Sequence, residues 1–280
     1  MTAGLIVFSD LDGCLLDRDT YSFEPAREAL EALRRRGVPV VPCTGKTQAE
    51  TAPLVARLGL RTPFVVENGG GVVGPSDPAG WYGPLPGPNG PRLLALGVPR
   101  GRLLGELPRL ARDAGVGLRG FSTMSPEEVA ALTGLGTKEA ALALHREFDE
   151  PFLVAGSEGR DEALDQELDA CARRIGLRVS HGGRLHHLHG PHDKGHGVRA
   201  VLGLWAAPAV RTVALGDAAS DLPLLQAVAR PILVPGPSGV DPALAAALPR
   251  AECAPRPGPE GWNAALLSVL DGAVLPRVGA

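Results

Sequence analysis

The sequence predicts an α/β protein with a Rossmann-like core, a mostly parallel sheet with helices on both faces, and an inserted α+β domain. Three observations lead to this fold class. Apolar runs typical of buried strands alternate with amphipathic helices over residues 1–83, and the same alternation returns over residues 191–280. Residues 74–91 are dense in Gly and Pro, which marks a boundary. We therefore expect a core made of both outer segments and an inserted domain over residues 84–190.

The first core segment contains the signals of strands and helices in alternation. Residues 5–8 form an apolar run that predicts a buried strand. A helix is expected to begin at Glu24, with Pro25 in its first turn, and to end at Gly37. The other expected elements are strands at 38–43 and 63–67, a helix at 47–58, and a hairpin that returns through 72–73.

The inserted segment follows a different order, in which strands can pair through hairpins. Ser125 and Pro126 form a strong helix start, with an N-cap followed by Pro at the first helical position. A hairpin is expected to turn at Gly182-Gly183. The remaining expected elements are helices near 103–114, 137–146 and 161–175, strands at 116–121 and 151–155, and the two arms of the hairpin within 177–189.

After Lys194 the alternation of the first segment resumes. The expected elements are helices at 194–205, 220–228, 241–248 and 262–270, with strands at 210–215 and 231–234.

Composition excludes several classes of protein. The chain has 280 residues, is 44% hydrophobic and 21% charged, and carries a net charge of −3, which gives no electrostatic reason to expect nucleic acid or an anionic membrane as partner. No apolar run approaches the roughly 18 residues that span a bilayer, and the N-terminus lacks a signal peptide's apolar stretch. The four cysteines form no C-x-x-C pair, so a cytoplasmic protein without disulfides is expected. Scarce Lys with abundant Ala, Pro and Arg suits a high-GC genome, a hot habitat, or both.

Asp10-Leu11-Asp12-Gly13 is the most informative motif, because it places two acids at the end of the first strand. Gly13 allows the chain to curl, so both carboxylates can turn toward one point beyond the strand. In open α/β sheets this edge is where ligands bind. Two crowded acids repel each other unless a cation or a proton intervenes. A plain strand followed by an Asp-Gly turn is the alternative.

Three further motifs place polar residues at strand ends or helix starts. Thr44-Gly45-Lys46 follows the second expected strand, Lys194 opens a helix, and Asp217 and Asp221 follow the strand at 210–215. Together with Asp10 and Asp12, these motif residues occur along the chain in the order Asp…Asp, Thr, Lys, Asp…Asp. The set resembles the four motifs of the haloacid dehalogenase superfamily phosphatases. The resemblance implies a Rossmann-like core with a cap domain.

The resemblance also implies a role for each motif residue. Asp10 would be the nucleophile that forms an aspartyl-phosphate, and Asp12 the general acid and base. Thr44, Gly45 and Lys194 would hold the phosphoryl oxygens. The expected cofactor is Mg²⁺, with Mn²⁺ or Co²⁺ as alternatives, and its expected ligands are Asp10, the backbone carbonyl of Asp12, Asp217 and, through a water or as an outer ligand, Asp221.

Two motif residues are assigned with alternatives. Lys46 could contact phosphate, but a cation at a helix start is opposed by the helix dipole, and a solvated residue is the favoured alternative. Ser220 stands where the superfamily usually has Asn. A serine donates one hydrogen bond but reaches less far, which leaves the role of Ser220 open.

The inserted segment resembles a narrower group, the mannosyl-3-phosphoglycerate phosphatases. The resemblance lies in residues 124–130, 132–135, 146–152 and 182–184, while residues 67–70 resemble superfamily members whose cap domain is inserted after the third strand. It implies hydrolysis of mannosyl-3-phosphoglycerate to mannosylglycerate, a compatible solute. The implied partner is therefore a small phosphorylated glycoside.

Substrate contacts are expected from this region. Arg184 could bind the glycerate carboxylate bidentately, and Glu147 and Glu150 could accept hydrogen bonds from sugar hydroxyls. For each of these side chains a solvated or ion-paired role is the alternative. The full set of candidates is Asn68, Gly69, Arg146, Glu147, Glu150, Gly183 and Arg184.

Six histidines lie between residues 181 and 196, which is a reason to consider a zinc site. His187 and His189 would share one strand face. No cysteine and no H-E-x-x-H frame accompanies them, so polar cap and linker residues are the favoured interpretation.

Other functions remain open on the sequence. They are a phosphatase for another sugar phosphate (glucosyl-3-phosphoglycerate or sucrose phosphate), a phosphomutase, and a non-catalytic sugar-phosphate sensor. The sequence gives no indication of the oligomeric state.

Overall fold

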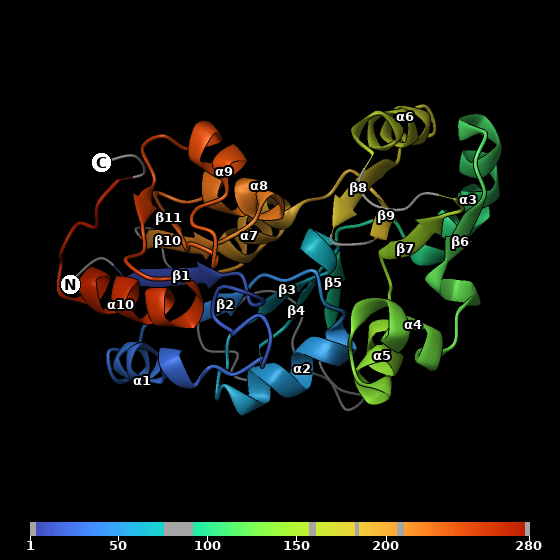
Figure 1. The fold of residues 1–280 in the computed structure, drawn as a ribbon. Helices are drawn as coiled ribbons and strands as arrows, with labels where there is room; N and C mark the ends of the chain where they lie inside the picture. Colours follow the sequence, from blue (N-terminus) through green and yellow to red (C-terminus); the bar gives the residue numbers. More distant parts are fainter. Residues whose placement is uncertain (1–3, 76–91, 157–160, 183–184, 206–209, 278–280) are drawn as a thin grey trace.

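The computed structural model describes residues 4–75, 92–156, 161–182, 185–205 and 210–277. Its elements fall into two halves joined by extended segments (Figure 1). We call the part that carries the N- and C-terminal elements the core half, and the part that carries the four-stranded sheet the cap half.

The elements of the core half follow the predicted alternation. Before the cap half they are β1 (Leu5–Ser9), α1 (Arg27–Arg35), β2 (Val40–Pro42), α2 (Gln48–Arg57), β3 (Phe64–Val66), β4 (Gly71–Val73) and β5 (Leu93–Ala95). After it they are α7 (Lys194–Gly203), β10 (Arg211–Gly216), α8 (Leu222–Gln226), β11 (Arg230–Leu233), α9 (Pro242–Ala247), β12 (Glu252–Cys253) and α10 (Gly258–Leu270).

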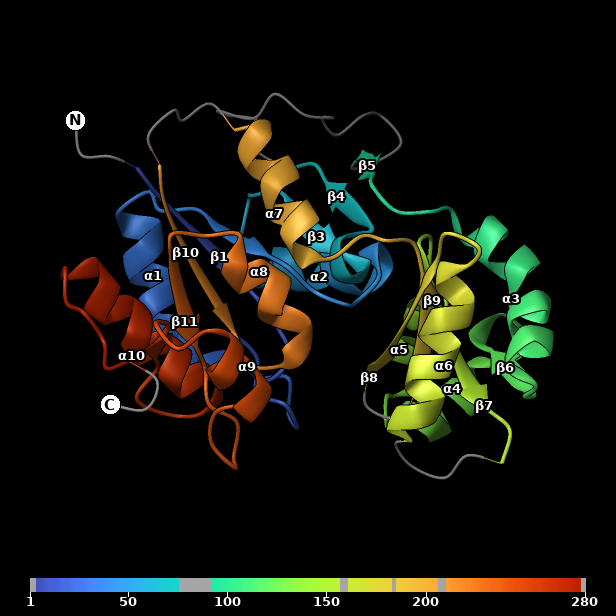
Figure 2. The ribbon, with the colours of Figure 1, turned by 90° about the horizontal axis from the view of Figure 1, so that it is seen from above.

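A five-stranded parallel sheet in the order β12-β11-β10-β1-β2 forms the centre of the core half. Side chains alternate between its faces, so Val7 packs with residues of α1 and α10, while Ile6 and Phe8 pack with residues of α7, α8 and α9. Figure 2 shows the helices on the two sides. The predicted α/β fold with a parallel sheet between helices is confirmed.

A second small sheet continues from the edge of the first. A parallel bridge joins Cys43 to Val65, and β3, β4 and β5 pair antiparallel. The predicted hairpin of β3 and β4 is therefore present, whereas β5 was not anticipated. This sheet leads the chain from the core half toward the cap half (Figure 1).

The cap half is an antiparallel sheet with helices. Its elements are α3 (Arg100–Ala114), β6 (Leu118–Gly120), α4 (Pro126–Thr133), α5 (Thr137–Ala143), β7 (Asp149–Val154), α6 (Glu162–Arg173), β8 (Arg178–Gly182) and β9 (Leu185–His189). The strand order is β6-β7-β9-β8, and α3 and α6 pack on one face through Phe152, Leu168 and Leu188. Ser125 is the N-cap of α4, as the sequence indicated, and it forms a capping box with Glu128.

The end of α5 and the start of α10 differ from expectation. α5 ends at Ala143 instead of running to Arg146, because the backbone N–H groups of Glu147 and Phe148 bond to the carboxylate of Glu67. α10 begins at Gly258, four residues early, because Pro259 fits the first helical turn.

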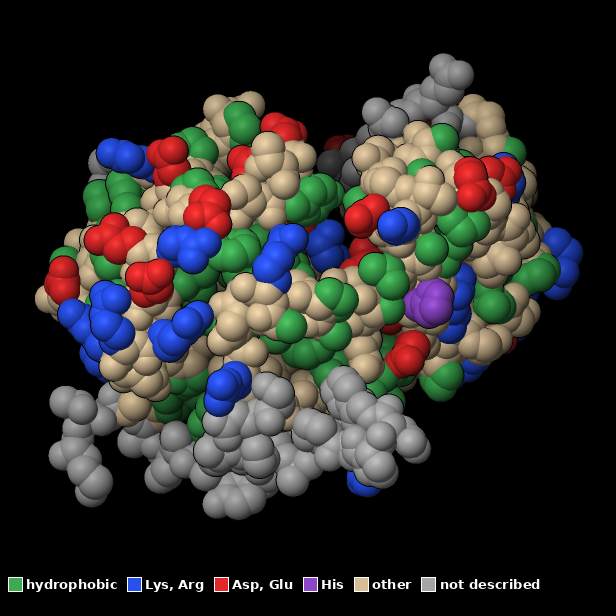
Figure 3. All heavy atoms as spheres, turned by 90° about the horizontal axis from the view of Figure 1, so that it is seen from below, with side chains coloured by type: hydrophobic (Ala, Val, Ile, Leu, Met, Phe, Trp, Pro, Cys, Tyr) green, Lys and Arg blue, Asp and Glu red, His purple; other side chains and the backbone are tan. Residues whose placement is uncertain are grey.

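The proposed division at residues 83 and 84 falls within 76–91, outside the described residues, and the domain boundaries stay a prediction. Within the described ranges, no helix combines the length and the apolar character needed to cross a bilayer. Acidic and basic side chains are interspersed on the face seen in Figure 3, and the surface is hollowed between the two halves.

Candidate active site

The candidate active site lies at the carboxyl edge of the parallel sheet. Asp10 directly follows β1 and Asp217 directly follows β10, and these neighbouring parallel strands end at the same edge. Gly13 has a φ of 82°, and a Cβ atom there would lie 2.7 Å from Oδ2 of Asp217. Glycine is therefore required both for the turn and for the close approach of the two loops.

Three buried carboxylates meet at this edge. Oxygen atoms of Asp10, Asp217 and Asp221 lie within 4.8 Å of one another. The ammonium group of Lys194 lies 2.6 Å from Oδ1 of Asp10 and 2.7 Å from Oδ1 of Asp221. Burial raises the pKa of Asp10 well above its usual range, and the charge of Asp221 adds to this shift. The same two causes raise the pKa of Asp217 to about 6. The pKa of Lys194 rises because Asp10 and Asp221 outweigh the effect of its burial.

Asp221 is held in place by the backbone as well as by Lys194. Its Oδ2 accepts hydrogen bonds from the backbone N–H of Asp217 at 3.0 Å and of Ala218 at 3.1 Å. These donors fix the loop that carries Asp217. The role of Asp221 beside a metal ion stays a prediction.

Arg18 is a member of the site that the sequence did not indicate. Its Nη2 lies 2.5 Å from Oδ2 of Asp217, although the Arg18 side chain is 59% exposed. It comes five residues after Gly13, in a loop without a motif, so only the fold shows the contact.

The carboxylate cluster fits a divalent cation. All three groups offer hard oxygen ligands, which Mg²⁺ prefers. Three carboxylates face one ammonium group and one guanidinium group, so one negative charge remains uncompensated. Burial is the main cause of the raised pKa values of Asp10 and Asp217, and the negative charge of Asp221 adds to it.

The second motif lies beside this cluster. Thr44 is buried, and its backbone N–H donates a hydrogen bond to the carbonyl of Val65 at 3.0 Å. Its Oγ1 accepts a hydrogen bond from the backbone N–H of Lys46 at 3.1 Å. The Nζ of Lys46 lies 2.9 Å from Oδ2 of Asp12 and 4.8 Å from the centre of the Tyr21 ring. The favoured expectation of a solvated Lys46 is wrong, since its side chain is 15% exposed and the Asp12 carboxylate offsets the opposing helix dipole.

Asp12 is not a member of the three-carboxylate cluster and pairs with Lys46. Its Oδ1 is buried and has no hydrogen-bond partner within the described residues. The two acids of the first motif therefore have different surroundings, Asp10 beside Lys194 and Asp12 beside Lys46. Different surroundings suit different chemical roles.

The turn at residues 67–69 brings the two halves together. Glu67, Asn68 and Gly69 all have positive φ, of 47°, 52° and 97°. The carboxylate of Glu67 accepts hydrogen bonds from the backbone N–H groups of Glu147 at 2.9 Å and Phe148 at 2.8 Å. Burial raises the pKa of Glu67 to about 7. Two consecutive non-glycine residues at positive φ indicate strain that these contacts stabilise.

A polar cluster of the cap half faces the second motif. Nη1 of Arg146 donates to the carbonyl of Gly45 at 3.2 Å and to Oδ2 of Asp149 at 2.6 Å. Nδ1 of His187 lies 2.8 Å from the same Asp149 oxygen. His187 and Arg146 lower the pKa of Asp149 despite its burial. Nε of Arg146 and Oδ1 of Asp149 are buried without partners within the described residues, so both atoms are available to a ligand.

Comparison with known proteins identifies the family. Residues 7–80 match the model of the haloacid dehalogenase-like hydrolases. The chain is 36% identical over 278 residues to the glucosyl-3-phosphoglycerate/mannosyl-3-phosphoglycerate phosphatase of Methanococcoides burtonii, covering 95% of this chain and 97% of that protein. The chain belongs to the haloacid dehalogenase-like hydrolases.

Other hydrolases of this superfamily are also similar to the chain. The mannosyl-3-phosphoglycerate phosphatase of Pyrococcus furiosus is 31% identical over 228 residues, with 80% of this chain and 88% of that protein covered. The sucrose-phosphatase of Synechocystis, solved with sucrose and phosphate, has a TM-score of 0.60 at 16% identity and covers 96% of this chain and 98% of that chain. At that identity the likeness shows a shared haloacid dehalogenase-like fold.

The expectation that Glu150 binds the sugar hydroxyls of the substrate requires correction. Its carboxylate is fully buried, Oε2 accepts from Nε of Arg100 at 2.7 Å, and Oε1 accepts from the backbone N–H of Ser122 at 2.8 Å. Neighbouring residues of a strand point to opposite faces, so Asp149, and not Glu150, faces the core half. Strand periodicity could have indicated Asp149, while its partner His187 was assigned only to a histidine cluster.

The remaining expected residues are placed as follows. Asn68 lies against Gly45, where an added Cβ would approach Nδ2 of Asn68 to 3.1 Å, and Gly69 packs so closely on the backbone of Asp193 that no Cβ fits. The side chain of Glu147 is exposed, and so is Ser220. Gly183 and Arg184 lie outside the described residues.

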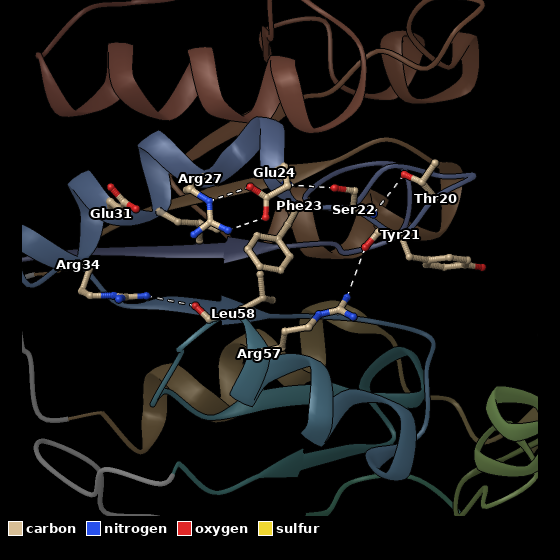
Figure 4. A pocket seen from close by; sticks show the side chains of 11 residues that line it. Thr20, Tyr21, Ser22, Phe23, Glu24, Arg27, Glu31, Arg34, Arg57 and Leu58 are labelled. Carbon is tan, nitrogen blue, oxygen red and sulfur yellow. Dashed lines mark hydrogen bonds and ion pairs between the residues drawn. The ribbon is translucent and has the colours of Figure 1, made fainter.

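A pocket of about 540 Å³ is lined by residues between 20 and 34 and by Arg57 and Leu58 (Figure 4). Its arginines already have partners: Arg27 pairs with Glu24, Arg34 donates to the carbonyl of Leu58, and Arg57 donates to the carbonyl of Tyr21. None of the expected catalytic residues lines it.

Proposed function

We propose that this protein is a Mg²⁺-dependent phosphatase that hydrolyses mannosyl-3-phosphoglycerate, and its glucosyl analogue, to the glycosylglycerate and phosphate. The observation that carries the proposal is the Asp10 carboxylate, held by Lys194 within a cluster that can ligate a cation. The names of the relatives from M. burtonii and P. furiosus support the substrate class.

The chain's own groups would perform two displacements at phosphorus. An oxygen of Asp10 attacks phosphorus, the bond to the glycerate oxygen breaks, and Asp12 gives that oxygen a proton. Asp12 then takes a proton from a water that attacks the aspartyl-phosphate, and the bond between Asp10 and phosphorus breaks. Lys194 and Thr44 would bind the phosphoryl oxygens, and Lys46 would orient Asp12.

Asp10, the backbone carbonyl of Asp12, and Asp217 would hold Mg²⁺, with Asp221 supporting them. When bound, the ion would neutralise phosphate charge and reduce the repulsion between the carboxylates. Removing excess negative charge matters here, because a dianionic phosphate must approach three buried carboxylates.

The polar cluster of Arg146, Asp149 and His187 is proposed to bind the rest of the substrate. Arg146 carries a guanidinium that can bind the glycerate carboxylate, and Asp149 and His187 can bind sugar hydroxyls. The contact of Arg146 with the Gly45 carbonyl places this cluster next to the second motif.

A phosphate-release screen tests the proposal. The panel contains mannosyl-3-phosphoglycerate, glucosyl-3-phosphoglycerate, sucrose phosphate and simple sugar phosphates, each with and without Mg²⁺. We expect the highest kcat/KM on the two phosphoglycerates and no release from Asp10→Asn. A higher kcat/KM on sucrose phosphate would reassign the substrate, and an absence of release from the whole panel would favour a sensor.

A further inference from the structure

A second group of possible metal ligands lies in the cap half, away from the phosphoryl site. Asp165 of α6, His181 of β8 and His186 of β9 each place one ligand atom within 4.8 Å of the others. His181 and His186 face each other directly across the β8–β9 pair, so they share one face of the sheet. α6 packs against β8 and supplies Asp165 to the same face (Figures 1 and 2).

The two imidazole rings are positioned by their surroundings. Their centres lie 4.8 Å apart at an interplanar angle of 69°. His186 is 5% exposed, stacks on Phe152 at 5.4 Å, and has its Nε2 at 2.8 Å from Oδ1 of Asp165. A fixed ring with its nitrogen aimed at a carboxylate and at a second imidazole resembles the donor arrangement of a metal site.

This face of the cap sheet is not used by the proposed phosphatase mechanism. Adjacent strand residues point to opposite faces, so His186 lies with α6 while His187 contacts Asp149 on the other side. His187 and His189, the pair singled out from the sequence, do not converge on one ion. His187 pairs with Asp149, and Nδ1 of His189 lies 2.7 Å from the Gly190 carbonyl.

We propose that Asp165, His181 and His186 form a binding site for Zn²⁺ that ties α6 to the β8–β9 hairpin. Two imidazole nitrogens and one carboxylate oxygen form a ligand set that suits Zn²⁺ better than Mg²⁺, which prefers oxygen ligands. Three protein ligands leave a fourth position for water. His181 is partly exposed, which gives the ion a path from solvent.

The chemistry of the donors supports this site. Nε2 of His186 lies 2.8 Å from Oδ1 of Asp165, and one ligand atom of His181 lies within 4.8 Å of a ligand atom of each. A neutral ring offers the lone pair that a metal requires. A bound ion would replace the hydrogen bond between His186 and Asp165. It would also bind His181, which takes no part in that hydrogen bond.

The test is zinc binding to the full chain, measured with Mg²⁺ in excess so that the three-carboxylate cluster is filled. After chelator treatment and dialysis, we expect titration calorimetry and elemental analysis to show one tight equivalent of Zn²⁺. His181→Ala should abolish this binding, and Asp165→Asn should weaken it at least tenfold. His145→Ala changes an exposed histidine of the same half and should bind like the parent chain.

Two further measurements distinguish the loss of the zinc site from a loss of folding. Co²⁺ in the parent chain should give the visible absorption of a tetrahedral centre, and His181→Ala should lose it while its circular dichroism is unchanged. Zn²⁺ should raise the Tm of the parent chain but not of His181→Ala, with phosphate release the same in both. Equal zinc in the parent chain and in His181→Ala, or no tight equivalent in the parent chain, would overturn the proposal.

Discussion

The Nζ atom of Lys194 lies 2.6 Å from Oδ1 of Asp10, a residue 184 positions away in the sequence. The same ammonium group lies 2.7 Å from Asp221, and all three side chains are buried. One cation thus compensates two acids of the site. The predictions below follow from this arrangement and from the contacts around it.

Replacing Lys194 with Met should abolish most activity and destabilise the protein. Removing one partner of a buried ion pair costs about 3–5 kcal/mol, because the other charges stay buried. The loss of a charged donor to phosphate should reduce kcat at least about 100-fold. Urea unfolding and phosphate release measure the two effects. A variant with parental stability would show that the buried pair is not formed in solution.

Lys46→Met should change activity far more than stability. The pair of Lys46 and Asp12 is partly exposed, with side chains 15% and 39% accessible, so it contributes no more than about 1 kcal/mol to folding. We expect a reduction of kcat of about tenfold or more, since Asp12 would lose its orienting partner. Lys138→Met, which changes an exposed lysine of the cap half, is the control. Unchanged kcat in Lys46→Met would show that Lys46 does not orient Asp12 for catalysis.

Glu67 should make the stability of the protein depend on pH. Burial raises its pKa in the folded protein to about 7, above the usual 4.5, so the folded state binds a proton that the unfolded state releases. The stabilising contribution is complete below about pH 4.5 and disappears as pH rises through 7. Relative to Glu67→Gln, the free energy of unfolding of the parent chain should fall by about 3 kcal/mol between these limits.

The measurement for Glu67 is urea unfolding of both proteins across pH 4.5 to 8. Glu162→Gln, at an exposed position of α6, controls for the loss of a surface charge. Parallel pH profiles of the parent chain and Glu67→Gln would show that Glu67 titrates as an ordinary exposed acid.

Asp149→Asn and Glu150→Gln form a matched pair of neighbouring substitutions with different expected effects on KM. Asp149 faces the core half with a buried unpartnered oxygen, so its change should raise KM for phosphoglycerate substrates about tenfold. Glu150 is committed to Arg100 and Ser122, so its change should leave KM unchanged. Both substitutions remove a charge from a buried ion pair and should each cost about 3–5 kcal/mol of stability. Steady-state kinetics therefore distinguish the two variants. The reverse pattern would mean that Glu150, as the sequence suggested, contacts substrate.

Metal removal should abolish phosphate release without unfolding the protein. The three carboxylates are already held by Lys194, Arg18 and backbone N–H groups. After treatment with a chelator, we expect no release until Mg²⁺ is restored, with far-ultraviolet circular dichroism unchanged. Full activity in excess chelator would contradict a metal-dependent mechanism.

Much of the fold was predictable because its signals are local. The apolar run before Asp10, the capping box at Ser125 and the alternation of strands with helices each depend on a few adjacent residues. Elements without such a signal were missed. β5 is short and follows the Gly- and Pro-rich stretch. α5 ends early because Glu67, far away in sequence, accepts hydrogen bonds from the backbone N–H groups of Glu147 and Phe148.

The sequence by itself determined the parallel core and the motif residues at its strand ends, because strand polarity places consecutive carboxyl ends at one edge. Only the tertiary structure decided the partners of those residues. It paired Lys46 with Asp12 and Arg18 with Asp217, and it turned Asp149 toward the core half and Glu150 away. The reason is physical: side-chain partners depend on strand register and on loop paths between distant segments, which no local pattern encodes.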